Sequence, residues 1–281
     1  MATDLNTLAE KLYDRFGLPI RVLSDYTDEG LEFAIIPIGI EHTIAFTIKV
    51  ILGWRRLSAV FVPGDYAANL VTQMQKADIE KKVLFSIFAS DLAEKGALLD
   101  MIVNSRKIDP INPDDWIEEW KTLSLAMQKP QLVIEDQSQY NLKEALPWLY
   151  GFWGLCLSLL PIEQVEEQEA NGVIEGKLVW GKARGYERSK INRAACIQIH
   201  GCSCLICGFN FVERYGSLGS GFIHVHHVVP LSEIGEEYVC NPAQDLIPVC
   251  PNCHAMLHRK RSILTPSELR QVIEDHGRVD S

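Results

Sequence analysis

The sequence predicts an α+β protein in two parts, an N-terminal α+β domain followed by a smaller C-terminal domain stabilised by zinc. In the first 160 residues, segments with helical spacing of apolar side chains accompany short runs rich in β-branched residues. Between residues 202 and 258 the chain instead places six of its eight cysteines and five of its eight histidines. We therefore divide the 281 residues into a front domain (1–162), a linker (163–171) and a C-terminal domain (172–281).

Helical spacing of apolar residues, helped by capping and stop signals, predicts most of the front domain. Asp78 marks a break between two of these helices, and Asn112-Pro113 followed by two acids is a helix start. The expected helices are 4–17, two within 66–104, 112–127 and 141–160. Runs rich in β-branched residues predict strands at 31–38, 42–52 and 57–63. The strands precede most of the helices, which favours an α+β class.

Composition and hydropathy are those of a soluble globular protein. Hydrophobic residues make up 47% of the chain and charged residues 23%. The first residues lack the basic head and apolar run of a signal peptide. The longest apolar stretch, 146–160, has 15 residues, whereas a membrane helix needs about 20. We expect no membrane association and a location in the reducing cytoplasm, where clustered cysteines bind metal rather than form disulfides.

The net charge of −10 is unevenly distributed along the chain. Residues 177–281 carry 12 Lys and Arg against 10 Asp and Glu, a net charge of +2, so residues 1–176 carry −12. DNA binding depends on cationic neutralisation of phosphates. We therefore expect the front domain to lie away from a duplex or to bind a protein partner.

Residues 1–160 show no catalytic cluster. His42 is the single histidine there, and a lone histidine in a strand is more often packed or exposed than a metal ligand. Four tryptophans would suit a cage for a modified base, but spacings of four and five residues fit the apolar faces of helices better. They are Trp116, Trp120, Trp148 and Trp153. We therefore assign target or partner selection to this domain, and not bond cleavage.

A basic segment leads from the acidic, polar linker into the cysteine-rich region. Its side chains suit contacts with phosphates, and a solvated helix face is the alternative interpretation. Further basic residues follow the histidines near residue 258, where they also suit a helix C-terminus. The residues predicted to bind nucleic acid are Arg184, Arg188, Lys190, Arg193, Arg259 and Lys260.

Two cysteine pairs predict a structural zinc site. Cys204-x-x-Cys207 and Cys250-x-x-Cys253 are separated by 42 residues. Thiolates are soft ligands, and two residues between the members of a pair let one backbone turn aim both sulfurs at a tetrahedral ion.

The histidines require a second explanation, because four thiolates leave no room for them at that zinc. His254 and His258 would share one face of a helix, and imidazoles at this spacing suit a divalent metal. The segment 221–230 predicts a strand, so a hairpin followed by a helix would bring them close to His226 and His227. His224 would share the strand face of His226, either as a supporting partner or simply exposed.

The segments 226–231 (HHVVPL) and 245–258 (DLIPVCPNCHAMLH) resemble the HNH endonucleases, which have a ββα-metal core. The McrA-like restriction nucleases, in which paired cysteines bind a structural zinc, are the most similar branch. The resemblance covers about residues 170–275. It implies that His227 is the general base, that His226, His254 and His258 hold a catalytic cation, and that Asp245 takes the place usually held by Asn. There Asp245 would either brace the loop or ligate the metal.

The resemblance implies a zinc-stabilised ββα-metal (HNH) nuclease domain that hydrolyses DNA phosphodiester bonds with Mg²⁺ or another divalent cation, in restriction or anti-phage defence. The front domain would then either dock a sensor protein or recognise modified DNA. The alternative is a non-catalytic zinc-binding module that binds DNA or a protein without cleaving DNA. Its closed four-cysteine site would not need His226, His227, His254 and His258, so the sequence favours the nuclease.

Overall fold

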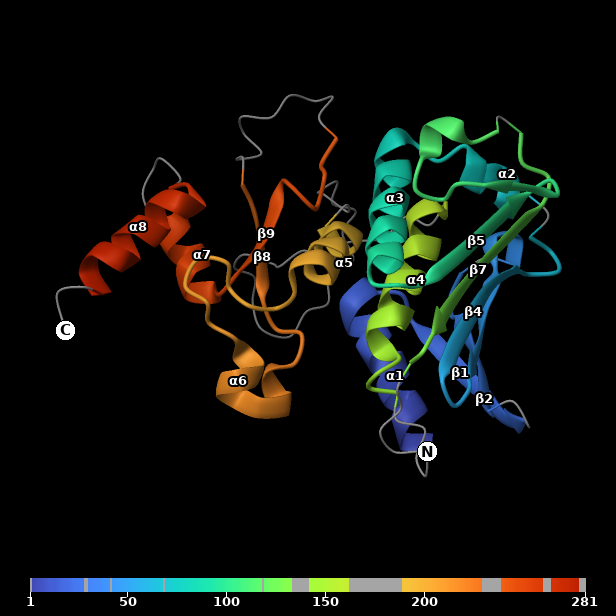
Figure 1. Ribbon diagram of the computed structural model, residues 1–281, viewed down its shortest axis with the longest axis horizontal. Helices are drawn as coiled ribbons and strands as arrows, with labels where there is room; N and C mark the ends of the chain where they lie inside the picture. The colour runs from blue at the N-terminus through green and yellow to red at the C-terminus, as the bar shows by residue number, and fades with distance from the viewer. Residues whose placement is uncertain are drawn as a thin grey trace, which may run out of the picture.

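The computed structural model describes residues 2–27, 30–40, 42–67, 69–117, 119–132, 142–161, 189–228, 239–259 and 264–277. They form a large sheet-and-helix front domain with a smaller C-terminal part beside it (Figure 1). The described helices include none long and apolar enough to span a bilayer.

The front domain is built on a seven-stranded antiparallel sheet in the order β1-β2-β3-β4-β7-β5-β6. Alternation along the strands puts one face in the core: Ile48 pairs with Ile35 on one side and Phe61 on the other, and all three are buried. The strands are β1 (Ile20–Thr27), β2 (Gly30–Pro37), β3 (Phe46–Leu52), β4 (Arg56–Pro63), β5 (Leu98–Val103), β6 (Arg106–Ile108) and β7 (Leu123–Pro130).

Helices pack on this sheet and on one another. α4 is buried on nearly every side, and its two glycines allow α3 to come very close. A Cβ at Gly154 would lie 2.4 Å from the Phe88 ring, and one at Gly151 would lie 2.6 Å from Leu92. Close helix packing thus explains why these two positions have no side chain. The helices are α1 (Ala2–Phe16), α2 (Leu70–Gln75), α3 (Ile79–Glu94) and α4 (Leu146–Leu159).

Two segments expected to be helical are strands. The end of 66–104 forms β5, and the end of 112–127 forms β7, which lies between β4 and β5 in the sheet. The helix start at Asn112-Pro113 is a single 3-10 turn. The segment of β7 forms a strand despite its helical pattern, because it hydrogen-bonds to a strand on each side and buries alternate residues. The sheet also contains β1, an edge strand that was not predicted from the sequence, and 42–44 is a 3-10 turn rather than the start of a strand.

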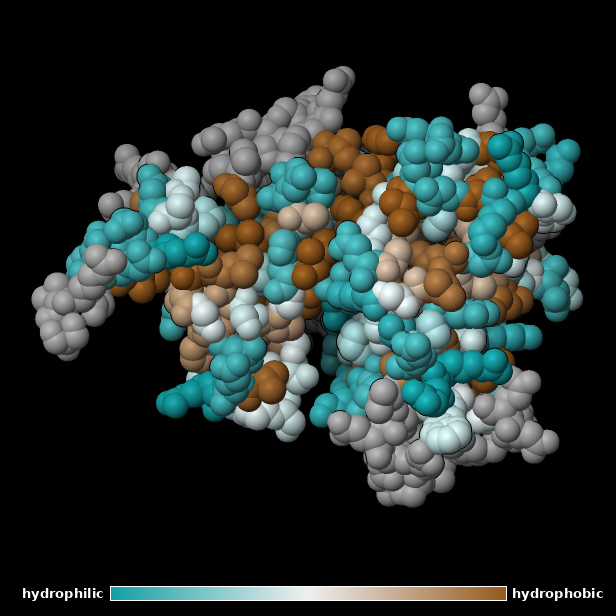
Figure 2. Space-filling model, in the orientation of Figure 1, coloured by the Kyte–Doolittle hydropathy of each residue, from teal (hydrophilic) through white to brown (hydrophobic). Residues whose placement is uncertain are grey.

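The C-terminal part contains a hairpin followed by a helix, in the order ββα. β8 (His224–His227) pairs with β9 (Leu246–Val249), and α7 (Pro251–Leu257) follows. Its core is small, with Ile206, Val249, Leu257 and Leu269 around the buried cysteines. The other helices are α5 (Ser189–His200), α6 (Phe211–Tyr215) and α8 (Pro266–Gly277). α8 is mainly hydrophilic on the face drawn in Figure 2.

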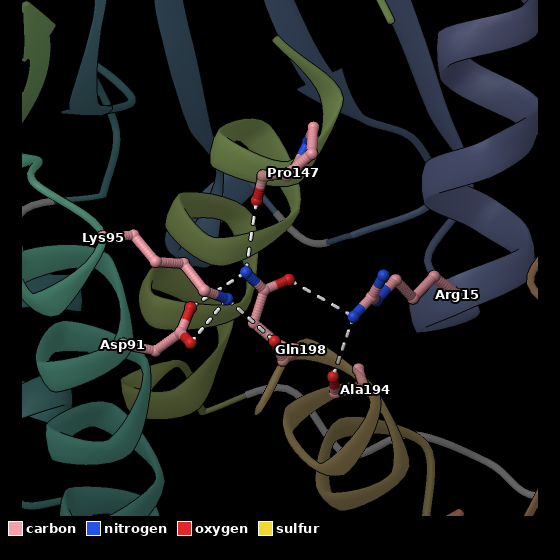
Figure 3. Close-up of polar contacts among 6 residues, drawn as sticks. All are labelled: Arg15, Asp91, Lys95, Pro147, Ala194 and Gln198. Atoms are coloured by element: carbon pink, nitrogen blue, oxygen red, sulfur yellow. Dashed lines mark hydrogen bonds and ion pairs between the residues drawn. The ribbon is translucent and has the colours of Figure 1, made fainter. Parts of the chain in front are cut away.

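Helix α5 joins the two parts. Its Ala194 and Ala195 are buried in the core of the front domain. Gln198, which is 8% exposed, donates to Asp91 Oδ2 (2.9 Å) and accepts from Arg15 (3.3 Å), while Arg15 also donates to Ala194 O (3.0 Å) (Figure 3). Lys95 Nζ bridges Asp91 (2.6 Å) and the carbonyl of Gln198 (2.9 Å). The predicted linker lies outside the described residues, so the proposed division of the chain stays a prediction.

Candidate active site and metal centre

The four paired cysteines converge on one point. Their Sγ atoms all lie within 4.8 Å of one another, in the set Cys204, Cys207, Cys250 and Cys253. Cys207 Sγ lies 3.7 Å from Cys250 Sγ. Around a tetrahedral zinc with Zn–S bonds of about 2.3 Å, sulfurs lie about 3.8 Å apart. The cluster therefore fits a structural zinc ion.

Local backbone geometry presents these sulfurs. Gly208 follows the first pair with φ +75°, which glycine adopts without strain, and its N–H donates to Cys204 O (2.8 Å). Leu205 N–H donates to Pro248 O (3.0 Å), which ties the first pair to β9 next to the second pair. The two cysteine turns are therefore held together by the hairpin as well as by the ligand they would share.

The chemistry of the thiols also supports a cation here. Burial opposes ionisation of Cys204, but hydrogen bonds from the backbone of Cys207, Cys250 and Ile206 bring its pKa down to about 7. Burial raises the pKa of Cys207 and of Cys253. Four neighbouring thiols cannot all ionise without a positive charge between them, and a bound zinc ion deprotonates its thiol ligands.

Three imidazoles form a second group. The ligand atoms of His226, His254 and His258 all lie within 4.8 Å of one another, and His258 Nε2 lies 3.3 Å from His226 Nδ1. His226 comes from β8, and the other two lie one helical turn apart on α7 and its C-cap. Nitrogens bound to one ion at about 2.0–2.1 Å lie about 3.0–3.4 Å apart. The group therefore fits a divalent cation.

Burial favours the neutral form, which metals require, in His226 and His254. His226 is 5% exposed. Burial, with the nearby His258, His254 and His227, lowers its pKa to about 4. Burial, with His224 and His258, also lowers the pKa of His254. At neutral pH these two rings therefore each offer a lone pair.

His227 lies outside the group of three and beside Asp245. As the next residue on β8, it points to the opposite face from His226. Burial lowers its pKa, and the charge of Asp245 opposes that shift. Asp245 Oδ2 accepts from Asn241 N–H (2.6 Å), and its carbonyl accepts from Val228 N–H (2.8 Å). Asp245 thus braces the loop that enters β9.

The predicted phosphate-binding residues have different environments. Arg193 is half-buried and donates from Nη2 to Ile223 O (2.8 Å), directly before β8. Lys190 and Arg259 are exposed. Arg184, Arg188 and Lys260 lie outside the described residues. This contact of Arg193 with Ile223 was not predicted from the sequence, although the apolar residues on the same helix indicate that one of its faces is packed.

Comparison with known proteins agrees with this geometry. Residues 204–260 match the family model of the HNH endonucleases. Over 77 residues, or 27% of its length, the chain is 34% identical to the type IV methyl-directed restriction enzyme EcoKMcrA of Escherichia coli (strain K12). The aligned region is 26% of that relative, so the chain matches about a quarter of its length. No solved structure matches the chain. The C-terminal region of this α+β chain therefore carries an HNH domain, similar to part of a McrA restriction enzyme.

Proposed function

We propose that this protein is a metal-dependent DNA endonuclease that acts in restriction or anti-phage defence. The observation that carries the proposal is the group of His226, His254 and His258, which the four-cysteine zinc cluster does not need. His227 lies next to this group with its own neighbour, Asp245. A zinc module that only binds DNA or protein would leave these imidazoles without a role.

Each residue has a defined task in hydrolysis. His227, kept neutral by burial, removes a proton from the attacking water as general base. Asp245 holds the loop beside it through Asn241 N–H. His226, His254 and His258 would hold a divalent cation, and three imidazoles suit an ion such as Ni²⁺ better than the oxygen-preferring Mg²⁺. The bound cation would supply Lewis-acid stabilisation of the negative charge on the phosphate and on the leaving oxygen. Arg259 and Lys190 are exposed cations suited to phosphate contacts.

The front domain is proposed to select the target or a protein partner. Residues 1–176 carry a net charge of −12, which disfavours close contact with a duplex. The name of the matched relative, a methyl-directed restriction enzyme, supports restriction as the biological role. We further infer a reducing compartment, the cytoplasm, because four cysteines cluster as candidate metal ligands.

The test is cleavage of plasmid DNA, unmodified and methylated, by the zinc-loaded full chain with and without Mg²⁺, Mn²⁺ or Ni²⁺. We expect cutting only with an added cation. His227→Ala should reduce the rate by roughly 10²–10⁴, the usual effect of losing a general base, while keeping its zinc and its unfolding transition. Undiminished cleavage in excess EDTA would contradict metal dependence, and the absence of cleavage on every duplex would support the non-catalytic alternative.

A further inference from the structure

His224 lies against the candidate metal site without belonging to it. It is two residues before His226 on β8 and therefore on the same face of the strand. Its Nδ1 lies 3.2 Å from Nδ1 of His254, and the two rings meet edge to face with centroids 5.2 Å apart. The ring of Phe222 packs on His224 at 6.0 Å. The mutually close ligand atoms come from the other three histidines and not from His224.

The contact between the two Nδ1 atoms restricts which tautomers the rings can adopt. Two ring nitrogens at hydrogen-bonding distance that do not share a cation need one N–H and one lone pair between them. If neutral His254 accepts at Nδ1, its proton is on Nε2 and the ring has no lone pair left for a cation. If His254 donates from Nδ1, its Nε2 lone pair is free. The second arrangement alone is compatible with metal binding.

We propose that His224 is a positioning residue that accepts a hydrogen bond from His254 Nδ1–H and so fixes the ring and tautomer of His254 for metal binding through Nε2. His224 then carries its own proton on Nε2. Histidine ligands regularly donate their second N–H to a carboxylate, carbonyl or water. Here a neutral imidazole takes that place. The inference rests on the proposed cation site of His226, His254 and His258.

Two variants separate hydrogen bonding from packing and from ligation. His224→Phe keeps a ring for Phe222 and His254 to pack against but has no acceptor. His224→Asn places an amide oxygen close to the position of Nδ1, so it keeps the acceptor while offering a poor ligand for Ni²⁺. Both are compared with the wild-type full chain, with zinc content and cooperative unfolding measured first.

The first readout is the binding of Ni²⁺ to the zinc-loaded proteins by calorimetry. We expect His224→Phe to weaken affinity by about 10–100-fold, as loss of a supporting partner does, and His224→Asn to stay close to the wild type. Equal affinity of His224→Phe and wild type would overturn the proposal. Equal weakening of both variants would also overturn it, because the imidazole itself would then be the ligand. Absence of Ni²⁺ binding by the wild type would instead refute the cation site of the proposed function.

The second readout does not depend on added metal or on activity. Long-range ¹H–¹⁵N spectra of histidine-labelled protein report which nitrogen of His254 carries the proton. We expect Nδ1–H in the wild type and in His224→Asn. A proton on Nε2 of His254 in the wild type overturns the proposal, even if His224→Phe fails to fold.

Discussion

His227 and Asp245 form a pair whose electrostatics set the pH range of the proposed reaction. Burial lowers the pKa of His227 below its usual 6.5, and the negative charge of Asp245 raises it in part. A general base works in its neutral form, so a lowered pKa keeps His227 competent at neutral pH. Activity should therefore be present above the pKa of His227 and be lost as pH falls through it.

The charge of Asp245 provides a test of this assignment. In Asp245→Asn the opposing interaction is gone, so the pKa of His227 should fall further. The acid limb of the kcat/KM profile, measured with saturating cation, should then move to lower pH than in the wild type. Because Asp245 also braces the loop through Asn241 N–H, the maximal rate is expected to drop as well. An acid limb that stays in place or moves to higher pH would argue against His227 as the base.

At the scale of the elements, the β8–β9 hairpin and α7 depend on the cysteine cluster for their packing. The small core around them contains few apolar side chains besides the buried thiols. A core of this size contributes little hydrophobic stabilisation, so a structural zinc ion would supply much of the folding free energy of this part of the chain.

Cys253→Ser tests that dependence. We expect loss of the zinc ion and of the folded C-terminal part. One thiolate fewer weakens zinc binding, and the small core cannot stabilise the folded state without the zinc ion. Zinc content and amide hydrogen exchange of β8, β9 and α7 are the measurements. Cys202→Ser is the matched control, since Cys202 lies outside the four-sulfur group, and it should keep its zinc. A Cys253→Ser protein that melts cooperatively without bound zinc would show that the cysteines are not the scaffold.

At the scale of the whole molecule, α5 makes the two parts interdependent. One face buries Ala194 and Ala195 in the front core. From the same helix, Arg193 donates to Ile223 O before β8, and His200 Nε2 donates to Ala243 O (3.1 Å) before β9. A fragment beginning near residue 172 would expose the apolar face of α5. We therefore expect this fragment to be less stable than the full chain. The fragment would still contain both groups of candidate metal ligands, since the described residues of the front domain include no such group.

Gln198→Ala tests the contact between α5 and the front domain. It removes the group that joins Asp91 of α3 to Arg15 of α1. Leaving buried polar groups with fewer partners should lower the free energy of unfolding by about 1–3 kcal/mol, measured by urea denaturation. Gln271→Ala on the exposed face of α8 is the matched control and should change it by less than about 0.5 kcal/mol. An unchanged stability in Gln198→Ala would mean that the front domain and α5 are not coupled through this network.

Elements whose conformation is set by residues close together in the chain could be predicted from the sequence, and elements set by distant contacts could not. The strands near 31–38 and 57–63 and the helices at 4–17 and 141–160 were predictable because apolar periodicity reports their buried faces. β5 and β7 were not, because their neighbours in the sheet decide their conformation. In the site, the grouping of His254 and His258 followed from helical spacing, whereas the contact between His224 and His254 required the register of the β8–β9 hairpin and the packing of α7 on it.

The sequence by itself determined the ligand chemistry of this protein: two CxxC pairs, the His226-His227 pair and histidines one helical turn apart, each defined by donor type and spacing over a few residues. Only the tertiary structure decided that β7 lies inside the sheet, that α5 belongs to the front core while holding the hairpin, and that His224 reaches His254. These features bring together residues far apart in the chain. Such contacts form only when the whole core closes, so short-range patterns carry little information about them.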